Sequence, residues 1–192
     1  AGDIYDLSDK MDKLPTATKE TDEYKIQDSY LYSVTSEMAE LYAERREVQA
    51  NKNLSKKEKY AKVQEIQKQI NSLAKEGLDN YQNVNKTDNY AIVGGREFNK
   101  YTTDSGEERW GAVFSDVLDD MNSMGMDIEE KSEYFKATST ISSIQSNYED
   151  SSDYVSKKRD VIGIIKDTNL NDEQKAYLYD KYYGNSDVVN AM

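Results

Sequence analysis

YKIQDSYLYSVTSEMAELYAERREVQANKNLSKKEKYAKVQEIQKQINSLAKEG, residues 24–77, contains two runs in which apolar side chains recur every three or four residues. That spacing places them on one face of an α-helix. The rows are Leu31, Val34, Met38, Leu41 and Val48, then Val63, Ile66, Ile70 and Leu73. Between the rows, Asn51 to Asn53 favour a helix end, and Ser55 with Glu58 has the pattern of a capping box. We therefore predict an antiparallel helical hairpin over residues 22–83, with Leu31, Val34, Met38 and Leu41 facing the second row.

The segment before the hairpin, residues 1–21, is predicted to be an N-terminal extension. It contains Pro15, the single proline of the chain, so almost all other positions are free to be helical. It holds no apolar stretch of the kind found in signal peptides, so we do not expect this segment to be a signal peptide. Because no initiator Met is present, we expect an internal fragment or a processed end.

After the hairpin the pattern changes from helical to β-prone. Residues 84–104 include a β-prone run on each side of Gly94-Gly95, and glycine tolerates the positive φ angles of a tight two-residue turn. We predict one short β-hairpin that links the two helical parts. The segment GGREFNK does not match the GxxxxGK[ST] pattern of a phosphate-binding loop.

Residues 105–192 are predicted to form a small helical bundle. Capping patterns mark three helix starts: Ser105 with Glu108, Asp127, and Asn171 with Gln174. The last helix should end at Gly184. The apolar rows are Trp110, Val113, Phe114, Val117, Leu118 and Met121, then Tyr134, Ala137, Ile141, Ile144 and Tyr148, then Val155, Val161, Ile162 and Ile165. The whole chain is thus predicted to be all-α, a helical hairpin plus a small bundle, with one short β-hairpin.

Composition excludes several classes of function. The 192 residues include no cysteine and no histidine, which excludes disulfides, thiolate nucleophiles, Cys/His zinc sites and imidazole-based triads. The formal net charge of -12 argues against direct nucleic-acid binding, because phosphate contacts need a basic face. Residues 31–77 nevertheless carry nine basic and seven acidic side chains. No apolar run approaches the roughly 20 residues of a membrane helix, so we expect no membrane span.

Acidic pairs are the remaining candidates for catalysis. They are Asp119-Asp120, Glu129-Glu130 and Glu149-Asp150. Each pair lies at a predicted helix edge or in a polar loop, where solvation or the helix dipole explains it. The oxygen-rich segment DNYQNVNKTDN, residues 79–89, lacks the ligand spacing of a calcium loop. We therefore expect no catalytic residue, no metal, no cofactor and no enzymatic activity.

The segment KAYLYDKYYGNS, residues 175–186, crowds four tyrosines into seven residues. Helical spacing collects on one face the side chains that we expect to be buried: Leu178, Tyr179 and Tyr182. They should pack against the predicted helices that contain Trp110 and Ile162. Tyr177 lies on the other side and is expected to be exposed. Tyr177 and Tyr183 are our candidate contacts to a partner protein.

A series of motifs in a fixed order resembles a known family. The motifs are YAIVGGREFNKY, EERWGAVFSDVLDDM, GMDIEEKSEYF, SKKRDVIGIIKD and LNDEQKAYLYDKYY, preceded by KLPTATKETDEYKIQDSYLYS. The chain is similar to the helical C-terminal regions of large polyvalent, virion-associated proteins of tailed phages and prophages, especially those of Gram-positive gut bacteria. The likeness covers most of the chain and rests on packing residues, so it assigns no catalytic position. It implies a role within the virion, beside other virion subunits, or release into the host cytoplasm with the DNA.

Two functions from different classes remain open. The first is a non-enzymatic structural or interaction module of a phage-derived protein, with an oligomer possible. The alternative is an acidic inhibitor that mimics nucleic acid, such as an anti-CRISPR protein. A mimic should line carboxylates in two rows at phosphate spacing on one face. A virion module should contact sister subunits through apolar or aromatic side chains.

Overall fold

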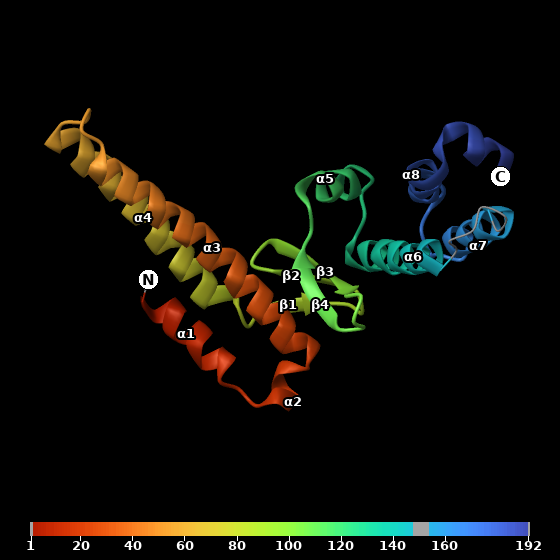
Figure 1. The fold of residues 1–192 in the computed structure, drawn as a ribbon, viewed down its shortest axis with the longest axis horizontal. Coiled ribbons are helices and arrows are strands. Elements are labelled where there is room, and N and C mark those ends of the chain that lie inside the picture. Colours follow the sequence, from red (N-terminus) through yellow and green to blue (C-terminus); the bar gives the residue numbers. More distant parts are fainter. Residues whose placement is uncertain (1, 148–153, 192) are drawn as a thin grey trace. The chain divides into compact units, whose positions relative to one another are not determined.

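The computed structural model describes the backbone of residues 2–147 and 154–191 and the side chains of residues 2–145 and 156–184. The described residues form eight helices and one antiparallel sheet with strand order β1-β2-β3-β4 (Figure 1). The elements are α1 (Gly2–Asp12), α2 (Thr16–Lys19), α3 (Asp22–Ala50), α4 (Lys56–Asn80), β1 (Val84–Lys86), β2 (Tyr90–Val93), β3 (Arg96–Thr102), β4 (Glu108–Ala112), α5 (Ser115–Ser123), α6 (Ile128–Asn147), α7 (Tyr154–Lys166) and α8 (Asp172–Ala191). The predominantly helical character is confirmed. The prediction of a single β-hairpin is wrong, because the sheet has four strands.

The chain divides into two compact units. The hairpin unit comprises residues 1–85 and 92–97, and includes α1 to α4. The bundle unit comprises residues 86–91 and 98–192, and includes α5 to α8.

The predicted helical hairpin is present in the hairpin unit. Helices α3 and α4 lie side by side along their length (Figure 1). Ser55 accepts a hydrogen bond from the Glu58 backbone N–H, and the Glu58 side chain accepts one from the Ser55 N–H, so the predicted capping box is confirmed. The side chains buried on the two helices include Leu31, Val34, Met38, Ile66 and Ile70. Leu41, Val63 and Leu73, which we predicted in the same core, are only half-buried.

The segment predicted as an extension forms α1 and α2, and α1 contacts both helices of the hairpin. Ile4 of α1 is fully buried and lies against Gly77 of α4. A Cβ atom at position 77 would meet the Ile4 side chain, and would also lie 3.3 Å from Val34 Cγ1. The missing side chain of Gly77 therefore lets α1 approach the base of the hairpin closely.

The predicted turn at Gly94-Gly95 is confirmed. Both glycines have positive φ, 55° and 76°, and they join β2 to β3. The turn also packs within the hairpin unit, because a Cβ atom on Gly94 would lie 2.7 Å from the Tyr30 hydroxyl. Tyr30 is fully buried, and its hydroxyl donates a hydrogen bond to the Glu76 carbonyl at 3.1 Å.

The helix predicted to begin at Ser105 is wrong. Residues 108–112 form strand β4, which pairs antiparallel with β3 so that Lys100 lies opposite Trp110. The backbone N–H of Gly106, whose φ is 87°, donates to the Thr103 carbonyl at 2.9 Å and closes a β-turn, and the Thr103 N–H donates to the Glu107 carbonyl at 2.8 Å. The serine-to-glutamate spacing of a capping box thus belongs to a hairpin turn. The helix begins only at α5, after Phe114, whose side chain is 79% exposed.

The remaining helix starts of the bundle unit are confirmed. Asp127 and Glu130 exchange reciprocal cap hydrogen bonds of 2.8 and 3.2 Å, and Asn171 and Gln174 do so at 2.9 and 3.1 Å. The predicted core residues that are buried here are Trp110, Met121, Tyr134, Ala137, Ile141, Val161, Ile165, Leu178 and Tyr179. Ile144, Ile162 and Tyr182 are half-buried, while Tyr148 and the side chain of Val155 lie outside the described residues. Gly184, with a φ of 72°, kinks α8 where we predicted its end.

Candidate functional site

Tyr177, predicted to be exposed, is half-buried in the bundle unit. Its hydroxyl donates a hydrogen bond of 2.6 Å to Asp120 Oδ2 of α5. Burial raises the pKa of Tyr177 well above its ordinary value, and the bond to Asp120 raises it further. The expectation of a solvent-facing ring is wrong because the Tyr177 ring meets α5 through the bond to Asp120.

Tyr177 belongs to a row of aromatic rings across the bundle unit. Its ring centroid lies 6.3 Å from that of Tyr134, which makes an edge contact of 5.2 Å with Phe135. Phe135 in turn stacks on Tyr90 at 5.7 Å. Lys181 donates a hydrogen bond of 3.1 Å to the Tyr134 hydroxyl. These contacts show that the rings are used for packing between α6, α8 and the start of β2.

Tyr182 and Tyr183 follow on the same helix and are also half-buried. Burial, with a smaller contribution from Tyr134, raises the pKa of Tyr182 to about 12. The ammonium group of Lys158 on α7 lies 5.3 Å from the centre of the Tyr183 ring. The expectation that Tyr179 and Leu178 are buried is confirmed, but Trp110, named as a helical partner, is on a strand. Partner binding by Tyr177 and Tyr183 stays a prediction.

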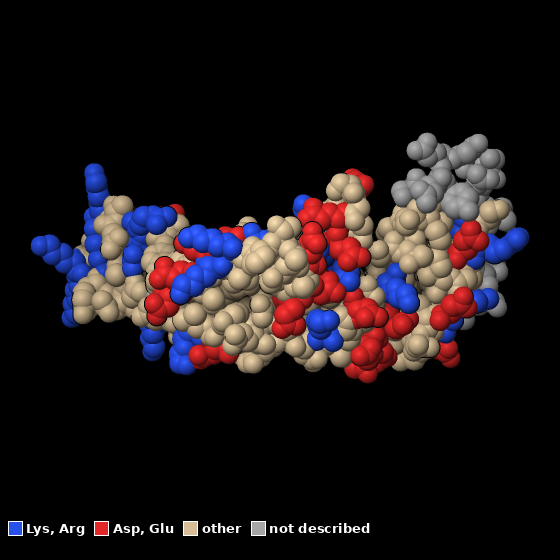
Figure 2. Space-filling model, turned by 90° about the horizontal axis from the view of Figure 1, so that it is seen from below, with Lys and Arg blue, Asp and Glu red and all other residues tan. Residues whose placement is uncertain are grey.

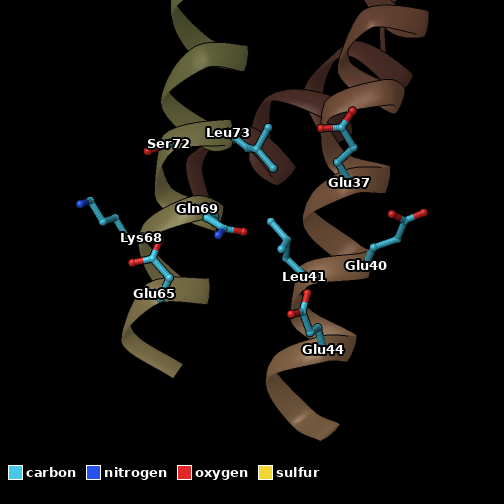
Figure 3. Close-up of a pocket in the computed structure, with 9 residues that line it drawn as sticks. All are labelled: Glu37, Glu40, Leu41, Glu44, Glu65, Lys68, Gln69, Ser72 and Leu73. Carbon is cyan, nitrogen blue, oxygen red and sulfur yellow. The ribbon is translucent and has the colours of Figure 1, made fainter. Parts of the chain in front are cut away.

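A second candidate site is a groove of about 730 Å³ on the hairpin unit, which we call the hairpin groove. It is lined by Glu37, Glu40, Leu41 and Glu44 of α3 and by Glu65, Lys68, Gln69, Ser72 and Leu73 of α4. Figure 3 shows Leu41 and Leu73 pointing into the space between the two helices, with Glu37 and Glu44 on either side of Leu41. Lys68 extends away from the leucine pair. The groove therefore has an apolar floor and an acidic rim.

One carboxylate of the rim is held by an ion pair. Arg96 of β3 makes two hydrogen bonds to the Glu37 carboxylate, of 2.5 and 3.0 Å, and its Nε lies 3.8 Å from Glu76. The hydrogen bond from Arg96 lowers the pKa of Glu37 below its ordinary value. The ion pair with Arg96 of β3 therefore holds the Glu37 carboxylate in place at the rim of the groove.

The other carboxylates of the rim are unpaired. Glu40, Glu44 and Glu65 are exposed and make no hydrogen bond or ion pair within the described residues. Cationic side chains gather instead at the far end of the hairpin, where Figure 2 shows lysine and arginine around the junction of α3 and α4. They include Arg46, Lys52, Lys56, Lys57 and Lys59. Charge is thus segregated along the hairpin, with an acidic groove and a basic end.

The acidic pairs considered for catalysis do not converge. Asp120 binds Tyr177, Asp119 is exposed on α5, and Glu130 caps α6. Glu149-Asp150 lies outside the described residues. Among the residues that the structure describes, no three Asp or Glu side chains form a group that could hold a metal ion. None of the described helices combines the length and apolar character that a bilayer crossing requires.

The chain matches no protein-family model, and comparisons with curated proteins and with solved structures also give no match.

Sequence reasoning missed the hairpin groove. Leu41 and Leu73 belong to the apolar rows, so their spacing alone assigns them to the core. The missed signal is the set of glutamates at positions 37, 40 and 44, which follow the same helical spacing beside Leu41. A row of like charges along the edge of an apolar row indicates that this part of the row borders solvent.

Proposed function

We propose that the chain is a non-enzymatic structural and interaction module of a phage-derived, virion-associated protein, and that it binds other virion subunits. The observation that carries the proposal is the hairpin groove, in which Leu41 and Leu73 remain half-buried, whereas Val34, Met38, Ile66 and Ile70 of the same helix pair are buried. Apolar side chains that a fold leaves accessible beside polar ones are typical of protein-binding surfaces. The phage context rests on the resemblance of the ordered motifs.

Two further features support a binding role over a catalytic one. Packing explains the raised pKa values of the bundle-unit tyrosines: burial is the main cause for Tyr177, Tyr179 and Tyr182, and the bond to Asp120 adds to it for Tyr177. The unpaired carboxylates of the groove are exposed, and exposed carboxylates lack the desolvation that tunes a general acid or base. The module acts within the virion or, after release, in the host cytoplasm.

Cross-linking in phage-producing cells tests this function. The full chain, carrying an affinity tag, is expressed during particle assembly, cross-linked in the cell, and recovered for mass spectrometry. We expect cross-links to identified virion proteins, including links from Lys68 at the groove. Recovery of a nuclease or another DNA-binding protein as the dominant cross-linked partner would instead favour the acidic inhibitor. The absence of any reproducible protein cross-link would contradict an interaction module.

A variant series tests the non-enzymatic part of the proposal. Replacing Asp119, Asp120 or Glu129 singly by the amide should leave particle assembly or partner binding largely intact, because the acidic pairs within the described residues do not converge on an acid–base site. Loss of all function in one such variant, with an unchanged melting temperature, would overturn the non-enzymatic part of the proposal.

A further inference from the structure

The floor of the hairpin groove is a small apolar surface that, among the described residues, is lined by α3 and α4 alone. Leu41 and Leu73 come from facing helices and point into the same space (Figure 3). Farther toward the base of the hairpin, the equivalent positions Val34 and Met38 are fully buried. The groove thus continues a packed core into a part of the helix pair where two side chains still expose apolar area to water.

The rim of the groove selects the charge of what can bind there. Four carboxylates and one ammonium group line it, and three of the carboxylates, those of Glu40, Glu44 and Glu65, are unpaired. An anionic ligand, such as a nucleic acid or an acidic lipid surface, would be repelled by this rim. A lysine or arginine placed beside an apolar side chain would meet both a carboxylate and a leucine.

The geometry points to an amphipathic helix of a partner protein, with lysine or arginine flanking its apolar face, as the occupant of the hairpin groove. The inference rests on the proposed function, since it names the kind of segment that the virion partner would present. A helix suits the site because the groove runs between two helices and supplies anchors at helical spacing along one side, at positions 37, 40, 41 and 44. The lysine-rich end of the hairpin repels the cationic side of the occupant and confines it to the acidic groove.

The probe for this inference is a blocked synthetic peptide of about four helical turns, with leucine on one face and lysine on the other. Two control peptides keep one feature each: in one, glutamate replaces lysine, and in the other, serine replaces leucine. Each peptide is titrated into the full ¹⁵N-labelled chain, and amide resonances are followed at low and at high salt. We expect the leucine–lysine peptide to shift resonances of residues 37–44 and 65–73, and to bind more weakly at high salt. Neither control peptide should do so.

Matched variants separate the groove from the general acidity of the chain. Glu44→Lys should weaken binding of the leucine–lysine peptide about tenfold or more, since it replaces an attraction by a repulsion. Asp119→Lys makes the same charge change on α5, at an exposed carboxylate outside the groove, and should leave the affinity unchanged. Leu41→Gln should weaken binding while leaving the salt dependence in place. Because Glu44 is exposed, the first variant tests the site even where Leu41→Gln disturbs folding.

Several outcomes would overturn the inference. The peptide could fail to bind, or it could shift the amide resonances of acidic residues across the whole chain to the same extent. Asp119→Lys could also weaken peptide binding as much as Glu44→Lys does. Self-association that Glu44→Lys abolishes without any peptide would assign the groove to a second copy instead. If an identified virion protein cross-links to the chain but binds Glu44→Lys as well as the wild type, this inference fails while the proposed function stands.

Discussion

Tyr177 shows how one residue changes meaning between the sequence and the folded chain. Helical spacing assigns Tyr177 to the exposed side of α8, because spacing relates a residue only to its neighbours on the same helix. The Asp120 carboxylate, 57 positions away in sequence, turns the ring into a contact between α5 and α8. A residue-level prediction from spacing is therefore reliable for the side that packs on the nearest helix, and weaker for the opposite side.

Removing the Tyr177 hydroxyl tests this contact. Tyr177→Phe should lower the free energy of unfolding by about 1 kcal/mol, because it breaks a hydrogen bond to a charged acceptor at a partly exposed site. Tyr32→Phe is the matched control, since Tyr32 is 74% exposed, and it should be neutral. Ultraviolet titration gives a second readout, because the raised pKa of Tyr177 makes it ionise late. Equal stability of the two variants, with no late-ionising tyrosine lost, would show that the bond is not formed.

Glu37 makes stability depend on acid pH. Its folded-state pKa lies below its ordinary value of 4.5, because Arg96 binds the charged form. The ion pair therefore stabilises the fold above that ordinary value, and the contribution is lost as pH falls through the folded-state pKa. Because Glu37 is 49% exposed, the contribution should be below about 1 kcal/mol and should shrink in salt.

The measurement is the difference in unfolding free energy between the wild type and Glu37→Gln across the acid range. We expect the variant to be less stable near neutral pH and equal to the wild type at strongly acid pH. Glu40→Gln, which removes an unpaired carboxylate one turn away, should show no such difference. A Glu37→Gln penalty that persists unchanged into acid would mean that its origin is not the ion pair.

Elements with strong local signals were predictable from the sequence, and elements defined by pairing were not. The helical hairpin follows from two apolar rows and the Ser55 capping box, which depend only on neighbouring residues. Strand β4 could not be found in this way, because Trp110, Val113 and Phe114 also fit a helical row. In the structure Trp110 of β4 lies opposite Lys100 of β3, and the Lys100 ammonium group lies over the Trp110 ring. Sequence spacing does not reveal this cross-strand contact. The hairpin groove was missed for a related reason. The apolar rows predict which side of each helix faces the other helix, but they do not predict at which point along the helix pair the side chains become accessible to solvent.

The turn between β2 and β3 gives a prediction for a single element. Gly94→Ala and Gly95→Ala both place a side chain at positive φ, at a cost of about 1–2 kcal/mol each. Only at Gly94 would the added Cβ also meet Tyr30 and Asn80, whereas at Gly95 nothing lies within 4 Å. Thermal unfolding should therefore show the larger loss for Gly94→Ala. Equal losses would mean that the turn does not pack on α3 and α4.

The core of the helical hairpin gives a second prediction at the scale of an element. Ile70→Ala should cost about 2–5 kcal/mol, because Ile70 is fully buried and its truncation leaves a cavity. Leu73→Ala, one turn along the same helix, should cost clearly less because Leu73 is half-buried at the groove. Chemical unfolding of both variants measures the contrast. If Leu73→Ala proves as costly as Ile70→Ala, the groove is closed in solution.

At the scale of the whole molecule, the two units differ in how they use their charged and aromatic side chains. In the bundle unit, tyrosines and lysines form packing contacts, and in the hairpin unit a helix pair carries an acidic groove and a basic end. A net charge of -12 thus coexists with a hairpin unit in which acidic and basic side chains lie at separate places. Under the proposed function, this separation favours one orientation of a bound protein partner, which the uniform rows of carboxylate that imitate a nucleic acid would not do.

The most direct test of the proposed virion role is the protein content of purified particles. Under the proposed function a phage encodes the chain, so particles of that phage are banded on a density gradient, and their proteins are quantified by mass spectrometry. We predict that the chain bands with the particles at a constant ratio to the other virion proteins, and that Glu44→Lys lowers this ratio while Asp119→Lys does not. A chain that is absent from the particles, and is recovered instead in a stoichiometric complex with a nuclease, would contradict the account.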